Sequence, residues 1–156
     1  MPADSSAPRY AGGCQCGAVR YVLTAAPRAA SVCHCRMCQK AGGAPFMVFA
    51  SVKNADLTFT RGAPAKYSSS DIAERGFCAA CGTPLTYQMK GGKSISVTIG
   101  SLDDPNLFPP RRQLGVEGTL HWVEGLAALP GQRTDEWLAA AKIENVGNHQ
   151  HPDHEI

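Results

Sequence analysis

The sequence has no long hydrophobic run and no excess of charge of either sign. No apolar stretch approaches the length of about 18 residues that suggests a membrane-spanning helix, so we expect no membrane partner. Its 15 Lys and Arg residues are nearly matched by 13 Asp and Glu residues, which gives a net charge of +2. This balance argues against nucleic acid as a partner, because nucleic-acid-binding domains carry a strongly basic face.

The sequence also has no low-complexity tract and no internal repeat, and its 156 residues are enough for one domain. Its start, MPADSSAPRY, lacks the basic region and the apolar core of a secretory signal. We therefore expect a cytoplasmic protein. The predicted organisation is a flexible leader, one folded domain, a C-terminal helix and a polar tail, at residues 1–9, 10–130, 131–145 and 146–156.

Most of the predicted regular structure is β-strand. Short segments rich in β-branched and aromatic residues are each bounded by Gly, Pro, Asp or Lys, which is typical of strands separated by turns. The predicted strands are 18–24, 45–52, 56–60, 84–89 and 94–100. The sequence therefore predicts a mainly β protein.

Helical signals are few. A short helix is expected after Cys35, ending at Gly42. A second is expected to start at Asp103 or Asp104, with a proline in its first position. The clearest signal is at 134–144, where a threonine can cap the helix and acidic residues occupy the first turn.

Cysteine is present in an odd number, seven, which leaves one thiol over in any fully paired disulfide scheme. Structural disulfides are rare in the cytosol, where clustered cysteines more often indicate metal or redox chemistry. The seven fall into three groups: Cys14 with Cys16, Cys33 with Cys35 and Cys38, and Cys78 with Cys81.

The first and last groups predict one structural zinc site. Residues two apart on an extended segment face the same side, so the C-x-C motif of Cys14 and Cys16 can direct both sulfurs at one ion. The C-x-x-C motif of Cys78 and Cys81 forms a tight turn with the same result. The glycine after this second motif permits its turn, and a closed zinc site requires four ligands. We call these residues the four-cysteine cluster.

The middle group, Cys33, Cys35 and Cys38, is called here the cysteine triad. A disulfide plus a spare thiol, a redox pair, or three ligands of one metal ion could each explain it. A redox function for Cys35 and Cys38 would require a thioredoxin-like βαβ context, which the sequence lacks. Three protein ligands with a vacant fourth position are typical of catalytic zinc, so we favour a second, open zinc site with variable occupancy.

The alternative for the triad is a closed structural site completed by a histidine. His34 lies between two of the cysteines and is expected to point away from the metal if the segment is extended. His121 is the remote candidate for a fourth ligand. The remaining histidines are expected to bind nothing specific: His149, His151 and His154.

Three segments carry a resemblance to a known family. GCQCGAVRY (13–21), CHCRMCQK (33–40) and FCAACGTPL (77–85) resemble the signature segments of the glutathione-dependent formaldehyde-activating (GFA) enzymes, a family that includes centromere protein V-like proteins. The similarity covers about residues 10–130. It implies an Mss4-like fold, a β-tent of antiparallel sheets built around zinc.

The resemblance also implies a function. In the family, the four-cysteine cluster corresponds to the structural zinc ligands and the cysteine triad to the site that serves the thiol substrate. The founding activity joins glutathione to formaldehyde and is classed as a carbon–sulfur lyase. The alternative is a zinc-stabilised carrier of glutathione or another small thiol, without chemistry.

Glutathione carries carboxylates, so cationic anchors for it are expected near the triad. Arg36 and Lys40 flank the triad and are the candidates for glutathione binding. Arg111 and Arg112 follow a turn and are two further cations. The sequence does not indicate which group would protonate the adduct.

Overall fold

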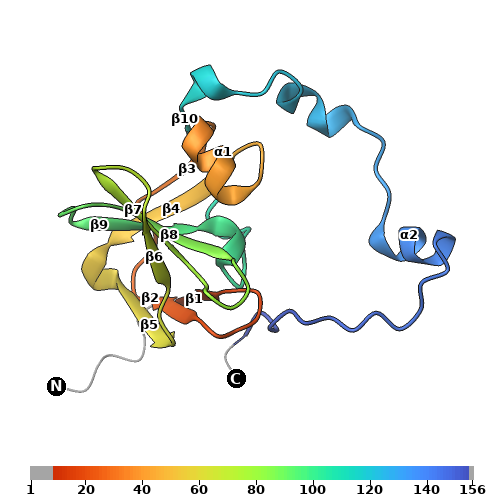
Figure 1. Cartoon of the computed structure of the whole chain (residues 1–156), viewed down its shortest axis with the longest axis horizontal. Coiled ribbons are helices and arrows are strands. Elements are labelled where there is room, and N and C mark those ends of the chain that lie inside the picture. Colours follow the sequence, from red (N-terminus) through yellow and green to blue (C-terminus); the bar gives the residue numbers. More distant parts are fainter. Residues whose placement is uncertain (1–8, 155–156) are drawn as a thin grey trace.

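Two β-sheets form the body of the computed structural model, which describes residues 9–154 (Figure 1). The smaller sheet has the antiparallel order β1-β2-β5. The larger sheet has the order β10-β3-β4-β9-β8-β7-β6, and only its β10–β3 pair is parallel. The strands are β1 (Tyr10–Gly13), β2 (Arg20–Leu23), β3 (Ala29–Cys33), β4 (Met47–Lys53), β5 (Leu57–Arg61), β6 (Ala65–Ser68), β7 (Ala73–Phe77), β8 (Pro84–Met89), β9 (Ser94–Thr98) and β10 (Gln113–Leu114).

The predicted fold class, a mainly β protein of antiparallel sheets with a short C-terminal helix, is confirmed. All five predicted strands are present, as β2, β4, β5, β8 and β9, with small shifts at their ends. Strands β1, β3, β6, β7 and β10 were not predicted. They are short, and several consist largely of small or polar residues, so their sequences carry little β signal.

The helices agree in part with the prediction. Helix α1 (Arg36–Gly42) begins directly after Cys35 as expected and has Gly43 in the left-handed conformation as its C-cap. Helix α2 (Thr134–Ala140) is capped by Arg133 rather than by the threonine, and it ends four residues before the predicted 144. The 3-10 helices are η1 (Asn54–Asp56), η2 (Ile99–Ser101), η3 (Val116–Gly118) and η4 (Val123–Ala128).

The helix predicted from Asp103 or Asp104 is wrong, because tertiary contacts fix this segment in another conformation. The Asp103 carboxylate accepts two hydrogen bonds from the Arg20 guanidinium, at 2.7 and 2.6 Å. The backbone N–H of Asp103 donates to the Ala11 carbonyl at 3.0 Å. Leu102 is buried and bridges to Gly12 of β1. The segment therefore joins the small sheet.

The main core contains fully buried side chains from both sheets, among them Tyr21 and Leu23 of the smaller one and Leu85 and Val97 of the larger one. Burial raises the pKa of Tyr21, whose hydroxyl is hydrogen-bonded to Ser101 Oγ at 2.8 Å. Cys14 and Cys78 belong to the same core cluster, so the four-cysteine cluster is continuous with it. A second, smaller core contains the cysteine triad.

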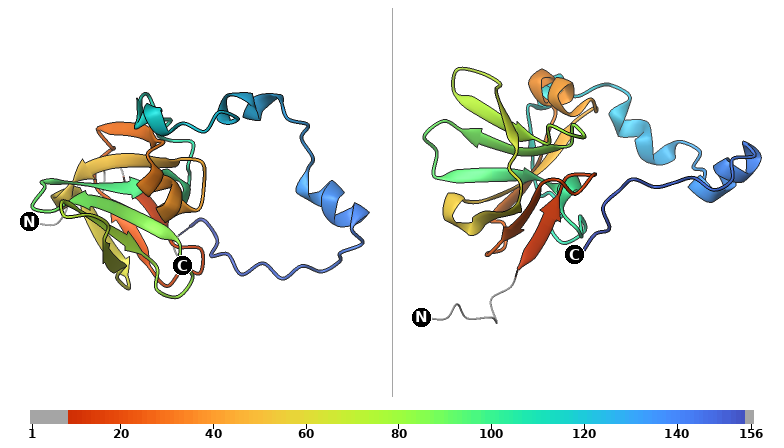
Figure 2. Two further views of the ribbon diagram at one scale, coloured as in Figure 1. Left: turned by 45° about the horizontal axis from the view of Figure 1, so that its top comes forward. Right: turned by 60° about the horizontal axis from the view of Figure 1, so that its bottom comes forward.

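The chain leaves the body after η3 and returns near its end, as the views of Figure 1 and Figure 2 show. The excursion carries η4 and α2, and its Trp122, Leu129 and Trp137 side chains are exposed. Of the predicted leader and tail, residues 1–8 and 155–156 lie outside the described residues. Among the helices of the described part, none is long and apolar enough to cross a membrane.

Candidate metal centres

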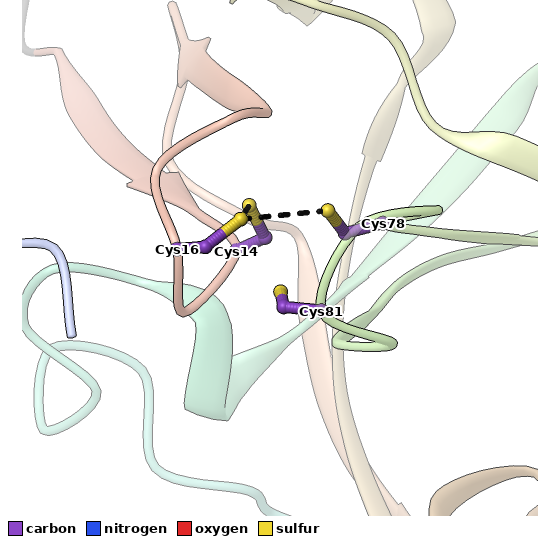
Figure 3. Close-up of side chains that lie close together, drawn as sticks. All are labelled: Cys14, Cys16, Cys78 and Cys81. Atoms are coloured by element: carbon purple, nitrogen blue, oxygen red, sulfur yellow. Dashed lines mark hydrogen bonds between the residues drawn. The ribbon is translucent and has the colours of Figure 1, made fainter. Parts of the chain in front are cut away.

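The four-cysteine cluster lies where two turns meet (Figure 3). Cys14 and Cys16 come from the β1–β2 connection, and Cys78 and Cys81 from the β7–β8 connection. The Sγ atoms of Cys14 and Cys16 are 3.6 Å apart, those of Cys16 and Cys78 are 3.9 Å apart, and all four lie within 4.8 Å of one another. A tetrahedral site with Zn–S bonds of about 2.3 Å places its sulfurs roughly 3.8 Å apart. The cluster could hold a metal ion of this kind.

Gly82 has the predicted role, whereas the segment of Cys14 and Cys16 is a turn closed by Gly17 and not the predicted extended segment. Gly17 and Gly82 have φ angles of +77° and +79°, which other residues rarely adopt. In each turn the glycine N–H closes back on the first cysteine: Gly17 donates to the Cys14 carbonyl at 3.1 Å, and Gly82 to the Cys78 carbonyl at 2.8 Å. The turns therefore hold the sulfurs together without a disulfide, and all seven cysteines are free.

The thiols of the four-cysteine cluster differ in acidity. Burial raises the pKa of Cys81, but hydrogen bonds from the Thr83 hydroxyl and backbone outweigh burial and lower it to about 6. The Ala18 backbone lowers the pKa of Cys16, but hydrogen bonds with neighbouring thiols, first Cys14, and burial raise it to about 11. Crowded sulfurs thus retain some of their protons, which a bound cation would displace.

The cysteine triad lies at the junction of β3 and α1. Cys33 ends the strand, Cys35 is the N-cap of the helix, and Cys38 lies in its first turn. The Sγ atoms of Cys33 and Cys35 are 3.5 Å apart, and all three sulfurs lie within 4.8 Å of one another. A disulfide would bring two sulfurs to about 2.05 Å. The triad is therefore a set of three free thiols that could hold a metal ion.

The triad thiols also differ in acidity. Burial raises the pKa of Cys33 to about 12. Burial raises the pKa of Cys35 too, but the Cys38 backbone N–H and the neighbouring thiols lower it by more, so it lies below its ordinary value. The Cys38 N–H lies 3.4 Å from Cys35 Sγ. Cys35 therefore gives up its proton more readily than Cys33.

Hydrogen bonds of His34 and Gln39 hold the triad segment in place. As predicted, His34 is not part of the cluster: it is buried, and its Nε2 is 2.7 Å from Gln113 Oε1. Gln39 Nε2 donates to the carbonyls of His34 and Gly118, each at 2.8 Å. His121 is exposed and belongs to neither cluster. Within residues 9–154, the triad thus has no histidine as a fourth ligand.

A cavity of about 230 Å³ opens in front of the triad, and all three cysteines line it. Apolar and aromatic side chains, including Phe49 and Tyr87, form part of its wall, and the exposed Arg112 also lines it. Five serines also line it: Ser31, Ser51, Ser69, Ser70 and Ser96. Of the four-cysteine cluster, only Cys14 lines any of the described cavities, a smaller polar one. The two clusters therefore differ in their access to a ligand.

Sequence reasoning missed Arg75, a buried residue of this cavity whose Nη2 lies 3.3 Å from Cys38 Sγ. The alternation of side chains along β7 is a signal that could have revealed it. Residues 73 and 75 lie on the same strand face, and the small apolar Ala73 suggests that this face is buried. Arg36 and Lys40, the predicted anchors, are exposed and line a neighbouring hollow rather than this cavity. Arg111 lines a further hollow, and Arg112 lines both that hollow and the triad cavity.

His151 was expected to bind nothing specific, yet it is the point at which the tail returns to the body. Its backbone N–H donates to the Gln15 carbonyl at 2.6 Å, and its ring covers Gly17 so closely that a Cβ there would lie 2.4 Å from it. A histidine in a polar tail carries no sequence signal for such a contact.

Fold and site together define a mainly β protein in which two cysteine clusters could each hold a metal ion, one continuous with the core and one open to a cavity. A family model described as glutathione-dependent formaldehyde-activating enzyme matches residues 9–117. The chain belongs to this family, and the resemblance seen in the sequence is confirmed.

Two relatives and one solved structure illustrate the similarity. An uncharacterised lyase of Schizosaccharomyces pombe is 34% identical over 87 residues, which cover 56% of this chain and 63% of that relative's length. A protein of Halomonas elongata named as a glutathione-dependent formaldehyde-activating enzyme is 28% identical over 152 residues, 85% of this chain and 96% of the relative. A Rhodobacter sphaeroides crystal structure, with a TM-score of 0.51 and 24% identity, covers 66% of this chain and 98% of its own and supports the fold.

Proposed function

We propose that this protein is a zinc-dependent enzyme that makes or breaks the carbon–sulfur bond of an adduct between glutathione, or another small thiol, and formaldehyde or a related small aldehyde. The observation that carries the proposal is the direction in which the triad opens. All three cysteines line one cavity, so we propose that a metal held by their sulfurs would have its free side toward a ligand. The family membership and the names of the relatives support the same chemistry.

The four-cysteine cluster is proposed to hold a structural zinc. Its sulfur separations suit four-coordinate thiolate ligation. Two of its cysteines are almost fully buried in the main core, and its two turns come from different sheets. A metal at this position would tie the sheets together.

The triad is proposed to hold the second zinc, through Cys33, Cys35 and Cys38. A bound metal ion would hold the substrate sulfur as a thiolate, because a coordinating thiol is deprotonated by the ion. The chain itself provides the position. Gln39 and His34 fix the segment that carries the three sulfurs, and the cavity holds the thiol and the aldehyde side by side, so that positioning supplies part of the acceleration.

The proposed reaction is an addition. The thiol sulfur bonds to the carbonyl carbon, the C–O π bond breaks, and the proton released by the thiol ends on the former carbonyl oxygen. The serine hydroxyls that line the cavity are the nearby groups that can donate a hydrogen bond to this oxygen. In the reverse direction the same bonds break, which is the lyase reaction.

The cavity is small for a tripeptide. Its volume of about 230 Å³ is below the roughly 300–1,000 Å³ of pockets that enclose drug-sized ligands. We propose that the thiol end of glutathione enters it and that the carboxylates remain outside. Arg36 and Lys40, which line the adjoining hollow, are then within the region where those carboxylates would lie.

Cobalt substitution tests this proposal. Glutathione added to the cobalt protein should produce a new thiolate-to-metal charge-transfer band, and Cys35→Ala should abolish that band while the protein stays folded, because the four-cysteine cluster does not use Cys35. Exchange NMR with formaldehyde then measures the rate of adduct formation against the uncatalysed rate. Binding without acceleration would select a thiol carrier instead. If no small thiol changes the cobalt spectrum, the proposal is wrong.

A further inference from the structure

Arg75 is a buried cation with no acidic partner among the residues that the structure describes. It is 8% exposed, and no ion pair joins it to a carboxylate within residues 9–154. The cavity that it lines has no carboxylate in its wall. Because an unpaired charge is costly to bury, we expect an anion to bind close to Arg75.

Every described contact of the Arg75 guanidinium is neutral or contains sulfur. Its Nε donates to Ser69 Oγ at 2.9 Å and its Nη1 lies 3.7 Å from Met47 Sδ. Its Nη2 donates to Cys38 Sγ at 3.3 Å, and its plane lies over the Tyr87 ring, 5.0 Å from the ring centroid. The side chain is therefore held in one place, with one edge directed at a triad sulfur.

The charges of a metal-loaded triad explain this arrangement. Three thiolates bring three negative charges and a divalent ion two positive ones, so the loaded triad would carry a net charge of −1. A thiolate entering as a fourth ligand would make the net charge −2. In a partly buried position such a charge is unfavourable unless a cation lies nearby, and Arg75 is the buried cation in contact with the cluster.

We propose that Arg75 is the counter-charge of the triad metal site, a positioning residue that acts through Cys38 and makes the site select an anionic thiolate over a neutral fourth ligand. This inference rests on the proposed function, since it requires a metal ion at the triad. It also goes beyond it, because it assigns ligand selectivity to a residue outside the ligand set.

The test compares two Arg75 variants with a control in the same cavity. Arg75→Gln keeps N–H groups but removes the charge, whereas Arg75→Lys keeps the charge but removes the planar guanidinium and its arrangement of N–H donors. Arg112→Gln removes an exposed charge that lines the same cavity, with no described contact to the triad sulfurs. Each protein is loaded with cobalt, and the second metal is titrated against a competing chelator. The first metal and the circular dichroism spectrum report folding.

Arg75→Gln should lower the affinity of the triad for its metal by about 10- to 100-fold, the usual effect of losing a group that supports a metal ligand. The metal affinity of the four-cysteine cluster should not change. Arg75→Lys should recover most of the loss. In the cobalt proteins, Arg75→Gln should also lower the affinity for 2-mercaptoethanol by more than the affinity for imidazole, which remains neutral when bound.

Either of two metal-titration results would overturn the inference alone: wild-type affinity for the second metal in Arg75→Gln, or equal losses of that affinity in Arg75→Gln and Arg112→Gln. An equal loss of mercaptoethanol and imidazole binding would also contradict it, since a merely structural role predicts no such selectivity. A wild-type protein that takes up only one metal would overturn the proposed function, and this inference with it.

Discussion

Replacing Cys78 by serine should leave the protein largely unfolded, even though the change removes only one sulfur atom. Cys78 is 1% exposed and lies in the main core beside Cys14. Structural zinc sites use thiolates and imidazoles as ligands, and serine supplies neither. The substitution therefore affects the metal and the core at the same time.

The expected magnitude follows from these two terms. Structural zinc contributes about 10–16 kcal/mol to the folding of zinc-finger peptides at pH 7, and a typical domain is stable by only about 5–15 kcal/mol. Even if three thiolates retained a weakly bound ion, a buried serine hydroxyl without a partner would cost about 1–3 kcal/mol. The combined loss should equal or exceed the whole free energy of unfolding.

Urea denaturation followed by circular dichroism, together with a zinc count, measures this effect. The matched control is Cys35→Ser, which also removes one cluster thiol but lies outside the main core. The control should keep one zinc and a cooperative unfolding transition, lowered only by the loss of the weaker triad metal. Cys78→Ser should show no cooperative transition, or one lowered by more than about 1 M urea, given slopes of about 1–3 kcal/mol/M for small proteins. A folded Cys78→Ser protein with the wild-type midpoint would refute the structural role of the four-cysteine cluster.

Three further predictions concern the metals, the buried ion pair and pH. A chelator should release the two metals in two steps, the triad metal first, because the triad has three thiols and faces a cavity; a single cooperative loss would contradict the open site. Asp103→Asn should lower the free energy of unfolding by about 3–5 kcal/mol, because it breaks the ion pair with the buried Arg20. The melting temperature should then fall by roughly 10 °C. The control Lys66→Ala, which breaks an exposed ion pair, should lower the free energy of unfolding by less than about 1 kcal/mol. Zinc affinity of the four-cysteine cluster should rise with pH, because the Cys16 thiol, with a pKa of about 11, must lose its proton on binding. It should rise more steeply below pH 6, where the Cys81 thiol, with a pKa of about 6, is protonated too, and equal slopes in competition titrations below pH 6 and at pH 7–9 would contradict this.

Several features of the fold were predictable because they depend on neighbours in the sequence. The C-x-C and C-x-x-C motifs bring their sulfurs together through local geometry, and the glycines at 17 and 82 allow the turns that do so. Helix α1 has its N-cap and C-cap within its own segment. The grouping of the cysteines, five of the strands and this helix could therefore be derived without tertiary information.

Other features were decided by contacts between distant segments. The Asp103 segment is not helical, because its carboxylate pairs with Arg20, 83 residues earlier. His151 returns from the excursion to cover Gly17, a contact that no local pattern indicates. In each case the free energy comes from a partner far away in the chain, which a local propensity does not contain.

The division is clearest at the triad. The spacing of Cys33, Cys35 and Cys38 alone predicts three sulfurs around one point. Which side of them is open, and which charge faces them, depends on strands that are far away in sequence. Arg75, for example, reaches Cys38 from β7, 37 residues later. The sequence by itself determined which cysteines lie together, and only the tertiary structure decided their surroundings, since strand pairing and register set which side chains meet across the sheet.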